Sequence, residues 1–159
     1  MAAETFARHG VGVILLDHKR TPGRKFLLAG RGGLNLTHSE PIEKLLHRYG
    51  DARLKLEPAI RAFPPEAIRQ WCEELGEPTF VGSSGRVFPK AMRASPLLRH
   101  WLHRLSGLGV EYRAGERWSG FTDHPTLLAL GGASWPELGS DASWVPAFAQ
   151  TGIQVAPFA

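Results

Sequence analysis

The stretch "VGVILLD", residues 11–17, decides the fold that this sequence predicts. It is a continuous apolar run of strand length, rich in branched side chains, and it ends in a lone acid, Asp17. Runs of this kind are typical of strands covered on both faces, as in a parallel sheet. Just before it, residues 2–10 carry apolar side chains at helical spacing and end in Gly10. A helix followed by a buried strand is half of a βαβ unit, so we expect an α/β fold.

Further elements follow along the chain. Helices are predicted in "PPEAIRQWCEELG" (64–76), in "SPLLRHWLHRLSGLG" (95–109, with Ser95 as cap), over about 39–49 with Thr37 or Ser39 as cap and Gly50 as stop, and in 140–152. Strands are predicted as a pair in "TFVGSSGRVFP" (79–89), in "VEYRA" (110–114), in the buried run "TLLALGG" (126–132), and from residue 153 onward. The apolar stripes predict Trp71, Cys72 and Trp101 as core residues.

Size and composition limit the class of protein. The 159 residues suit one domain, of which about 39–106 is predicted as a mainly helical segment. The net charge of +4 comes from scattered basic residues, which does not favour a nucleic-acid partner. One cysteine fits the reducing cytoplasm, and no apolar run approaches the ~20 residues of a membrane span. We expect neither a nucleic-acid nor a membrane partner.

Asp17 is the first candidate site residue, because it ends a strand and precedes "HKR". Ligands of open α/β sheets lie beyond the carboxyl ends of the strands, and an acid there accepts hydrogen bonds from a ribose. The alternative is a polar residue at the start of a loop, or an ion pair with Lys19 or Arg20. Asp17 alone favours the alternative, since many strands end in Asp.

Two glycine-rich segments are the second candidate. "GRGGLN", residues 30–35, resembles the start of G-x-G-x-x-G but has Asn35 where the last glycine belongs. The second predicted buried strand runs into Gly131 and Gly132. Glycines let backbone N–H groups approach an anion or a flat ring, whereas a plain turn is the other explanation.

Other chemistry is not supported by the residues. His100 and His103 share a helix face without a further ligand, so we expect no metal site. Ser83 and Ser84 lack the G-x-S-x-G arrangement of a hydrolase nucleophile, and no catalytic acid or base can be assigned.

Several segments together resemble the BaiN-like bacterial flavoproteins, which are NAD(P)/FAD-dependent oxidoreductases. They are "VGVILLDHKRTPGRKFLLAGRGGLNLTHSEP" (11–41), "FVGSSGRVFPKAMRASPLL" (80–98), "GVEYR" (109–113) and "LALGGASWPELGSDASW" (128–144). The resemblance implies a glutathione-reductase-like, Rossmann-type FAD-binding fold, with FAD as cofactor and NAD(P)H as reductant of an unknown small-molecule acceptor. It places Asp17 on the adenosine ribose. The further cofactor-binding positions that it implies are Gly23, Arg24 and Lys25 after the strand, Gly30, Arg31, Gly32, Gly33, Asn35 and Thr37 on the flavin side, and Gly131 and Gly132 near the FAD.

The resemblance also implies departures. Family members begin with a strand and a G-x-G-x-x-G loop and continue into a C-terminal domain, so we expect a partial fold lacking both. A parallel sheet without its first strand would expose an apolar edge and favour association. The alternative function is a truncated, non-enzymatic remnant that does not bind FAD.

Overall fold

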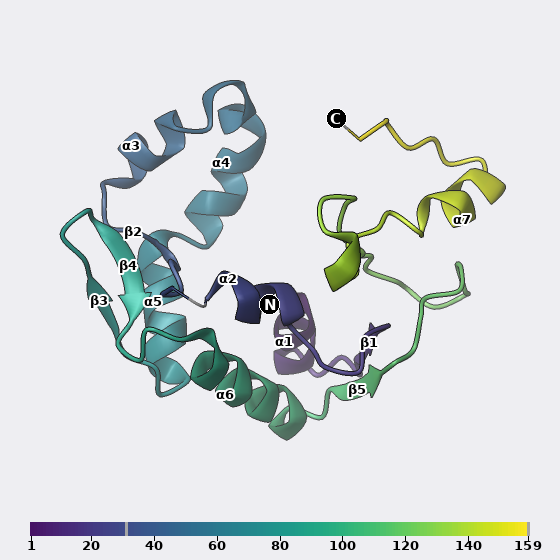
Figure 1. Ribbon diagram of the computed structural model, residues 1–159, viewed down its shortest axis with the longest axis horizontal. Helices are drawn as coiled ribbons and strands as arrows, with labels where there is room; N and C mark the ends of the chain where they lie inside the picture. Colours follow the sequence, from purple (N-terminus) through teal and green to yellow (C-terminus); the bar gives the residue numbers. More distant parts are fainter. Residues whose placement is uncertain (31, 159) are drawn as a thin grey trace. The chain divides into compact units, whose positions relative to one another are not determined.

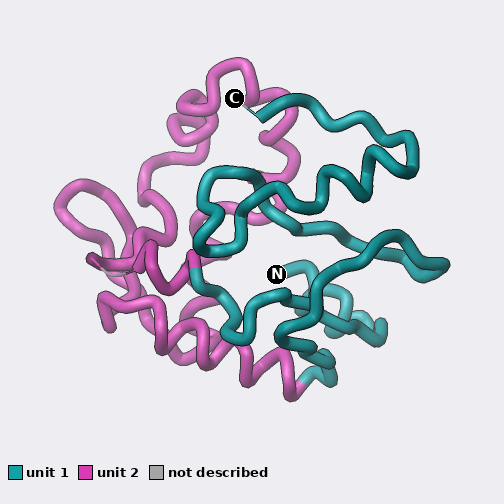
Figure 2. Tube along the Cα trace, turned by 45° about the vertical axis from the view of Figure 1, so that its right-hand side comes forward, with its two compact units in different colours: residues 1–24, 108–159 teal, residues 25–107 magenta. Residues whose placement is uncertain are grey.

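The computed structural model describes residues 1–30 and 32–158. The chain divides into two units, drawn in separate colours in Figure 2. Unit 1 comprises Met1–Arg24 and Leu108–Ala159, and unit 2 comprises Lys25–Gly107. The expected helical segment at about 39–106 falls inside unit 2, while the expectation of a single domain stays a prediction.

Unit 1 is built on a two-stranded parallel sheet of β1 and β5 (Figure 1). Its elements are α1 (Ala2–Arg8), β1 (Ile14–Asp17), β5 (Glu111–Ala114), the 3-10 helix η2 (Pro136–Leu138) and α7 (Val145–Gln150). Gly10 ends the first helical segment with a φ of 76°, a left-handed value that suits glycine. The predicted α/β class is confirmed by this parallel pair and the helices around it.

The register of the parallel pair fixes which side chains share a face. Asp17 lies opposite Ala114, and Leu15 lies opposite Tyr112. Since side chains alternate along a strand, these four residues share one face. On the other face Ile14 is 53% exposed and Leu16 is 39% exposed, so this part of β1 is not covered as a buried strand would be. Association through an exposed edge stays a prediction.

Two predicted strands of unit 1 are wrong. Residues 126–132 and 153–158 have no strand structure, and Leu127 is 61% exposed. Both segments are apolar enough for a strand, but a strand also needs a neighbour that takes up its backbone N–H and C=O groups. The described part of unit 1 supplies that neighbour for β1 and β5 alone.

Unit 2 consists of helices and a three-stranded antiparallel sheet with β4 in the centre. Its elements are α2 (Arg24–Ala29), β2 (Thr37–His38), α3 (Ile42–His47), the 3-10 helix η1 (Gly50–Ala52), α4 (Arg53–Ala62), α5 (Pro65–Glu74), β3 (Thr79–Val81), β4 (Arg86–Pro89) and α6 (Ala94–Gly107). The predicted helices at 64–76 and 95–109 and the predicted strand pair at 79–89 are confirmed. Nowhere in the described chain is a helix both long and apolar enough to cross a bilayer.

The core of unit 2 joins α5, α6 and the segment after α2. Cys72 and Leu97 are completely buried, and Leu34, Leu75 and Ala94 are nearly so. Partly buried side chains close around them: Phe26, Leu27, Leu36, Trp71 and Trp101. The rings of the two tryptophans meet edge to face with centroids 5.0 Å apart. The complete burial of Cys72 confirms it as a core residue, and the same burial raises the pKa of its thiol to about 11.

Several local predictions in unit 2 are wrong. Thr37 pairs in β2 instead of capping a helix, and α3 has Pro41 at its N-cap without a side-chain cap. Ser95 lies inside α6, one residue after its start. Helices α2 and α4 were not predicted. The segment of α2 lies between Gly23 and Gly30 and resembles a loop in sequence.

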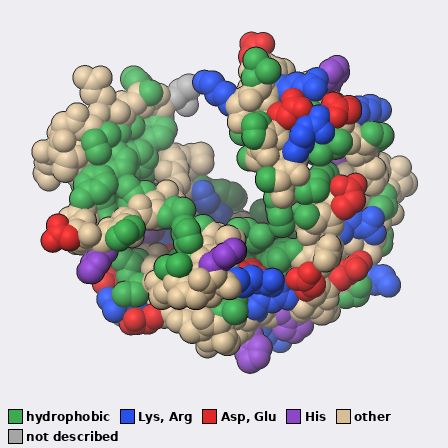
Figure 3. All heavy atoms as spheres, turned by 180° about the vertical axis from the view of Figure 1, so that it is seen from behind, with side chains coloured by type: hydrophobic (Ala, Val, Ile, Leu, Met, Phe, Trp, Pro, Cys, Tyr) green, Lys and Arg blue, Asp and Glu red, His purple; other side chains and the backbone are tan. Residues whose placement is uncertain are grey.

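An ion-pair network joins α3 to α4. Arg61 contacts both Glu43 (2.5 Å) and Glu57 (2.7 Å), and Arg53 contacts the same two carboxylates at 3.3 and 3.1 Å. Figure 3 shows the mixture of acidic and basic side chains over these helices. All four side chains are partly exposed to solvent, so we expect each ion pair to contribute little to stability.

Candidate functional site

The carboxyl end of β1 holds Asp17 in a defined position. Its Oδ1 accepts a hydrogen bond of 2.9 Å from the backbone N–H of Lys19. Its carbonyl oxygen accepts one of 3.2 Å from Glu116, and the carbonyl of Lys19 accepts one of 3.3 Å from Gly115. The chain beyond β5 therefore fixes the turn after β1, and one carboxylate oxygen of Asp17 is committed to that turn.

Two buried polar atoms lie in this part of unit 1. The hydroxyl of Tyr112 and Nε2 of His18 are shielded from solvent, and neither has a hydrogen-bond partner among the described residues. Burial and the charge of Asp17 raise the pKa of the Tyr112 hydroxyl. A buried polar group without a partner costs about 1–3 kcal/mol, so each calls for an explanation such as a water or a ligand.

The segment after residue 130 reaches the same strand end. A Cβ atom at Gly139 would stand 2.6 Å from the His18 ring and 3.0 Å from Cε of Lys19, and the φ of Gly139 is 94°. Only glycine fits this close approach in a left-handed conformation. The loop that contains Gly131 and Gly132 is thus anchored beside the residues that follow Asp17.

The local structure at Gly131 and Gly132 differs from the predicted strand end. They do not end a strand, although they lie in the same unit as Asp17. The carbonyl of Gly131 accepts a hydrogen bond of 2.9 Å from Nε1 of Trp144, and that of Gly132 accepts one of 3.2 Å from the N–H of Ala142. Their carbonyl groups thus hold the loop closed, which leaves their cofactor contact as a prediction.

The glycine-rich segment of unit 2 is packed more closely than a flexible turn. A Cβ atom at Gly30 would stand 2.5 Å from the Cβ of Ala94, and one at Gly33, whose φ is 110°, would stand 2.8 Å from Cε of Met92. A Cβ atom at Gly32 would meet nothing within 4 Å. Close packing against Ala94 therefore explains Gly30, and the left-handed φ explains Gly33, whereas neither reason applies to Gly32.

The other predicted positions are distributed over both units. Gly23, with a φ of 66°, lies in the turn before α2, and the exposed residues Arg24 and Lys25 begin that helix instead of a loop. Asn35 is exposed and Thr37 is half-buried in β2. Arg31 lies outside the described residues. The predicted residues thus form one group in unit 1 and another in unit 2.

Sequence reasoning missed an aromatic cluster in unit 1. The Phe148 ring stacks on Phe121 with centroids 5.5 Å apart and meets Trp118 and Trp144 edge to face at 5.7 and 4.8 Å. Phe158 contacts Trp144 at 6.1 Å. Hydrophobic side chains gather at the surface around α7 and the C-terminal segment (Figure 3). No periodic signal marks these residues, because they come from three irregular segments and one short helix.

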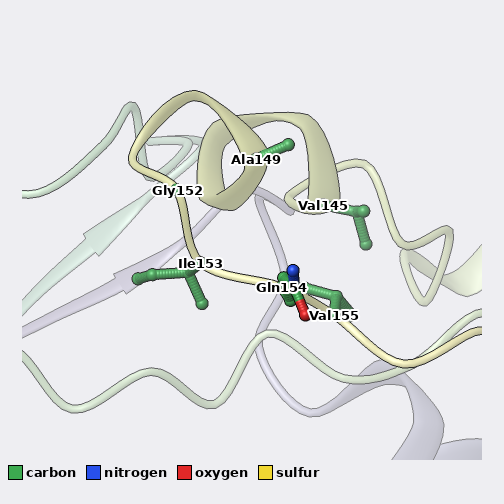
Figure 4. Close-up of a pocket in the computed structure, with 6 residues that line it drawn as sticks. All are labelled: Val145, Ala149, Gly152, Ile153, Gln154 and Val155. Carbon is green, nitrogen blue, oxygen red and sulfur yellow. The ribbon is translucent and has the colours of Figure 1, made fainter.

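An open pocket of about 520 Å³ adjoins this helix (Figure 4). Its lining residues are Val145, Ala149, Gly152, Ile153, Gln154 and Val155. Gln154 alone brings a polar side chain, so the pocket offers little to orient a ligand. None of the predicted site residues lines it.

A parallel strand pair with helices beside it defines an α/β protein, and an acid at the carboxyl end of a strand is a feature of Rossmann-type folds. A comparison with known families places the chain more closely: the family described as "HI0933-like protein Rossmann domain" matches residues 1–159. The chain belongs to this family, which is part of the FAD-binding oxidoreductase superfamily. No curated protein matches the sequence.

Proposed function

We propose that this chain is the FAD-binding part of a BaiN-like NAD(P)/FAD-dependent oxidoreductase. The observation that carries the proposal is the position of Asp17 at the carboxyl end of a parallel strand, in a chain that matches a Rossmann-type family throughout its length. An acid in this position is the usual acceptor for ribose hydroxyls of a dinucleotide.

The residues at this strand end fit a ribose. Oδ1 of Asp17 is held by the Lys19 N–H, which orients the carboxylate. The unpartnered hydroxyl of Tyr112 and Nε2 of His18 are consistent with a polar group that binds near them. We propose Asp17 as the ribose acceptor, with Gly131 and Gly132 as further contacts.

The roles proposed in unit 2 and at its boundary follow from the family resemblance. Gly32 has open space around its Cα and Asn35 is exposed, so both remain available to a ligand. The proposed set also contains Gly23, Arg24, Lys25, Gly30, Arg31, Gly33 and Thr37. Bound FAD would supply the redox chemistry, and we propose NAD(P)H as the hydride donor to an acceptor of unknown identity in the cytoplasm.

A titration of the purified chain with FAD tests the proposal. We expect the flavin absorbance bands to shift, and Asp17→Asn to weaken binding. Asparagine can still accept the Lys19 hydrogen bond, so this variant removes the charge while it keeps the turn. A hydrogen bond to a charged group contributes about 1.5–3 kcal/mol, which corresponds to ~10- to 100-fold in affinity. Asp123→Asn, at an exposed position of unit 1, is the matched control.

The second candidate is a family member that does not bind FAD. It is favoured by the absence of strand structure at residues 126–132, and by the packing at Gly30 and the left-handed φ at Gly33, which explain these glycines without a ligand. It predicts that the wild-type chain remains colourless after gel filtration with excess FAD. A stoichiometric yellow complex would exclude it.

A further inference from the structure

Tyr112 occupies a position that the proposed ribose site does not yet explain. It lies on β5 opposite Leu15, two pairs before the Asp17–Ala114 pair, and its side chain shares the face that carries Asp17. Its hydroxyl is shielded from solvent and has no partner among the described residues. Two tyrosines are present in the sequence, and the other one, Tyr49, is 41% exposed in unit 2.

The chemistry of the phenol makes it a donor at this place. Burial and the negative charge of Asp17 both raise the pKa of Tyr112, so the hydroxyl keeps its proton at neutral pH. A neutral phenol donates one hydrogen bond and accepts others, whereas an ionised carboxylate only accepts. A ligand hydroxyl between the two groups satisfies both, because it donates to the carboxylate and accepts from the phenol.

We propose that Tyr112 is a second ribose-binding residue, whose O–H donates to the same ribose hydroxyl that donates to Asp17. The inference rests on the proposed function and deepens it, since it adds a residue that distinguishes a ribose from its deoxy analogues. A deoxyribose without that hydroxyl leaves both Tyr112 and Asp17 without their ligand partner, and discrimination arises because unpaired buried groups are costly.

Binding of adenosine diphosphate and of its 2′-deoxy and 3′-deoxy analogues, measured by calorimetry, tests this inference. Tyr112→Phe should weaken the binding of adenosine diphosphate by about three- to ten-fold, the range of one neutral hydrogen bond. For the analogue that lacks the bridging hydroxyl, the wild type and Tyr112→Phe should bind equally. Tyr49→Phe should leave all three affinities unchanged.

A stability measurement separates this role from a structural one. Because the hydroxyl of Tyr112 has no partner among the described residues, the ligand-free Tyr112→Phe chain should unfold at the same urea concentration as the wild type, or at a higher one. The inference is overturned if Tyr112→Phe binds adenosine diphosphate as tightly as the wild type, or loses affinity equally for all three nucleotides. A wild-type chain that binds neither FAD nor adenosine diphosphate overturns the proposed function itself, and this inference with it.

Discussion

The two units differ in the size of their buried apolar cores. Among the described residues, nine of the ten buried apolar side chains belong to unit 2, and Val110 is the single one in unit 1. Unit 1 has a two-stranded sheet, an exposed β1 face and a partly exposed aromatic cluster. Two strands without a buried face are marginal by themselves. The residue proposed for the ribose thus lies in the unit with the smaller core.

This difference has a consequence for ligand binding. A ligand that binds the folded form stabilises it, and the gain is easiest to detect where the intrinsic stability is small. We therefore expect nucleotide binding to protect unit 1 more than unit 2. Four further experiments address the contrast between the units, from the largest expected effect to the smallest.

The largest effect is expected in the core of unit 2. Leu97→Ala removes a completely buried side chain next to Cys72 and should lower the free energy of unfolding by about 2–5 kcal/mol. Urea unfolding followed by circular dichroism measures it. Leu54→Ala, at a position that is 84% exposed, should stay within about 0.5 kcal/mol of the wild type. Equal losses in both variants would contradict a packed core in unit 2.

The close approach of Gly30 to Ala94 gives the next effect. Gly30→Ala places a methyl group where Ala94 already stands, and overpacking of this kind should cost about 1–3 kcal/mol. Gly32→Ala meets open space and should be nearly neutral in stability. The same urea experiment measures both. A neutral Gly30→Ala would mean that packing is not the reason for this glycine.

The aromatic cluster of unit 1 should contribute less, since it is partly exposed. Phe148→Ala removes a half-buried ring that contacts three others, and we expect a loss of about 1–2 kcal/mol. With Trp71 and Trp101 of unit 2 replaced by Phe in both proteins, so that only the tryptophans of unit 1 emit, the loss should appear in the fluorescence before Cys72 becomes reactive to a thiol reagent, because Cys72 is buried in folded unit 2. Leu127→Ala is the exposed control. Simultaneous transitions would show that the two units unfold together.

The smallest effect concerns the pH dependence of unit 2. Nη2 of Arg48 donates a hydrogen bond of 2.9 Å to Oε2 of the nearly buried Glu40, and Nε of Arg48 forms an ion pair with Oε1 at 2.6 Å. The hydrogen bond and the positive charge of Arg48 lower the pKa of Glu40 below its usual 4.5. A lowered folded-state pKa stabilises the protein above about pH 4.5, and this stabilisation is lost as the pH falls through the folded-state value.

Urea midpoints of the wild type and Glu40→Gln, measured between pH 3 and pH 7, test this pH dependence. The difference between the two proteins should be constant above about pH 5 and shrink toward pH 3. Arg48→Gln removes the main cause of the lowered pKa while Glu40 stays nearly buried, so its stability should rise less between pH 3 and pH 5 than that of the wild type. A difference that does not change with pH would contradict the role of this ion pair.

Much of the fold could be predicted where the pattern within a single segment indicates its secondary structure. The stripes of α5 and α6, the strand pair around Gly85 and the separate strands β1 and β5 were predicted from local pattern, whereas the parallel pairing of β1 with β5 was not. The segment "TLLALGG" has a similar pattern to "VGVILLD", yet it forms no strand. Pattern shows that a segment suits a sheet, but pairing depends on another segment that is far away in sequence.

The candidate site was predictable to a smaller extent. Asp17 was found because it ends a strand, and the structure adds the Lys19 hydrogen bond that fixes it. Tyr112 was missed because its position beside Asp17 follows from the register of two strands more than ninety residues apart. For the glycines at 30 and 33, the sequence suggested ligand contact or a turn, and the structure shows close packing against Ala94 and Met92.

By itself, the sequence determined the amphipathic helices of unit 2, the short apolar strands and the place of Asp17 at the end of the first strand. Each of these features depends on residues that are close together in the sequence. The tertiary structure decided which apolar runs found a partner strand, which glycines were needed for packing, and which tyrosine lies beside Asp17. These outcomes depend on backbone pairing and close contact between distant segments, and both arise when the chain folds.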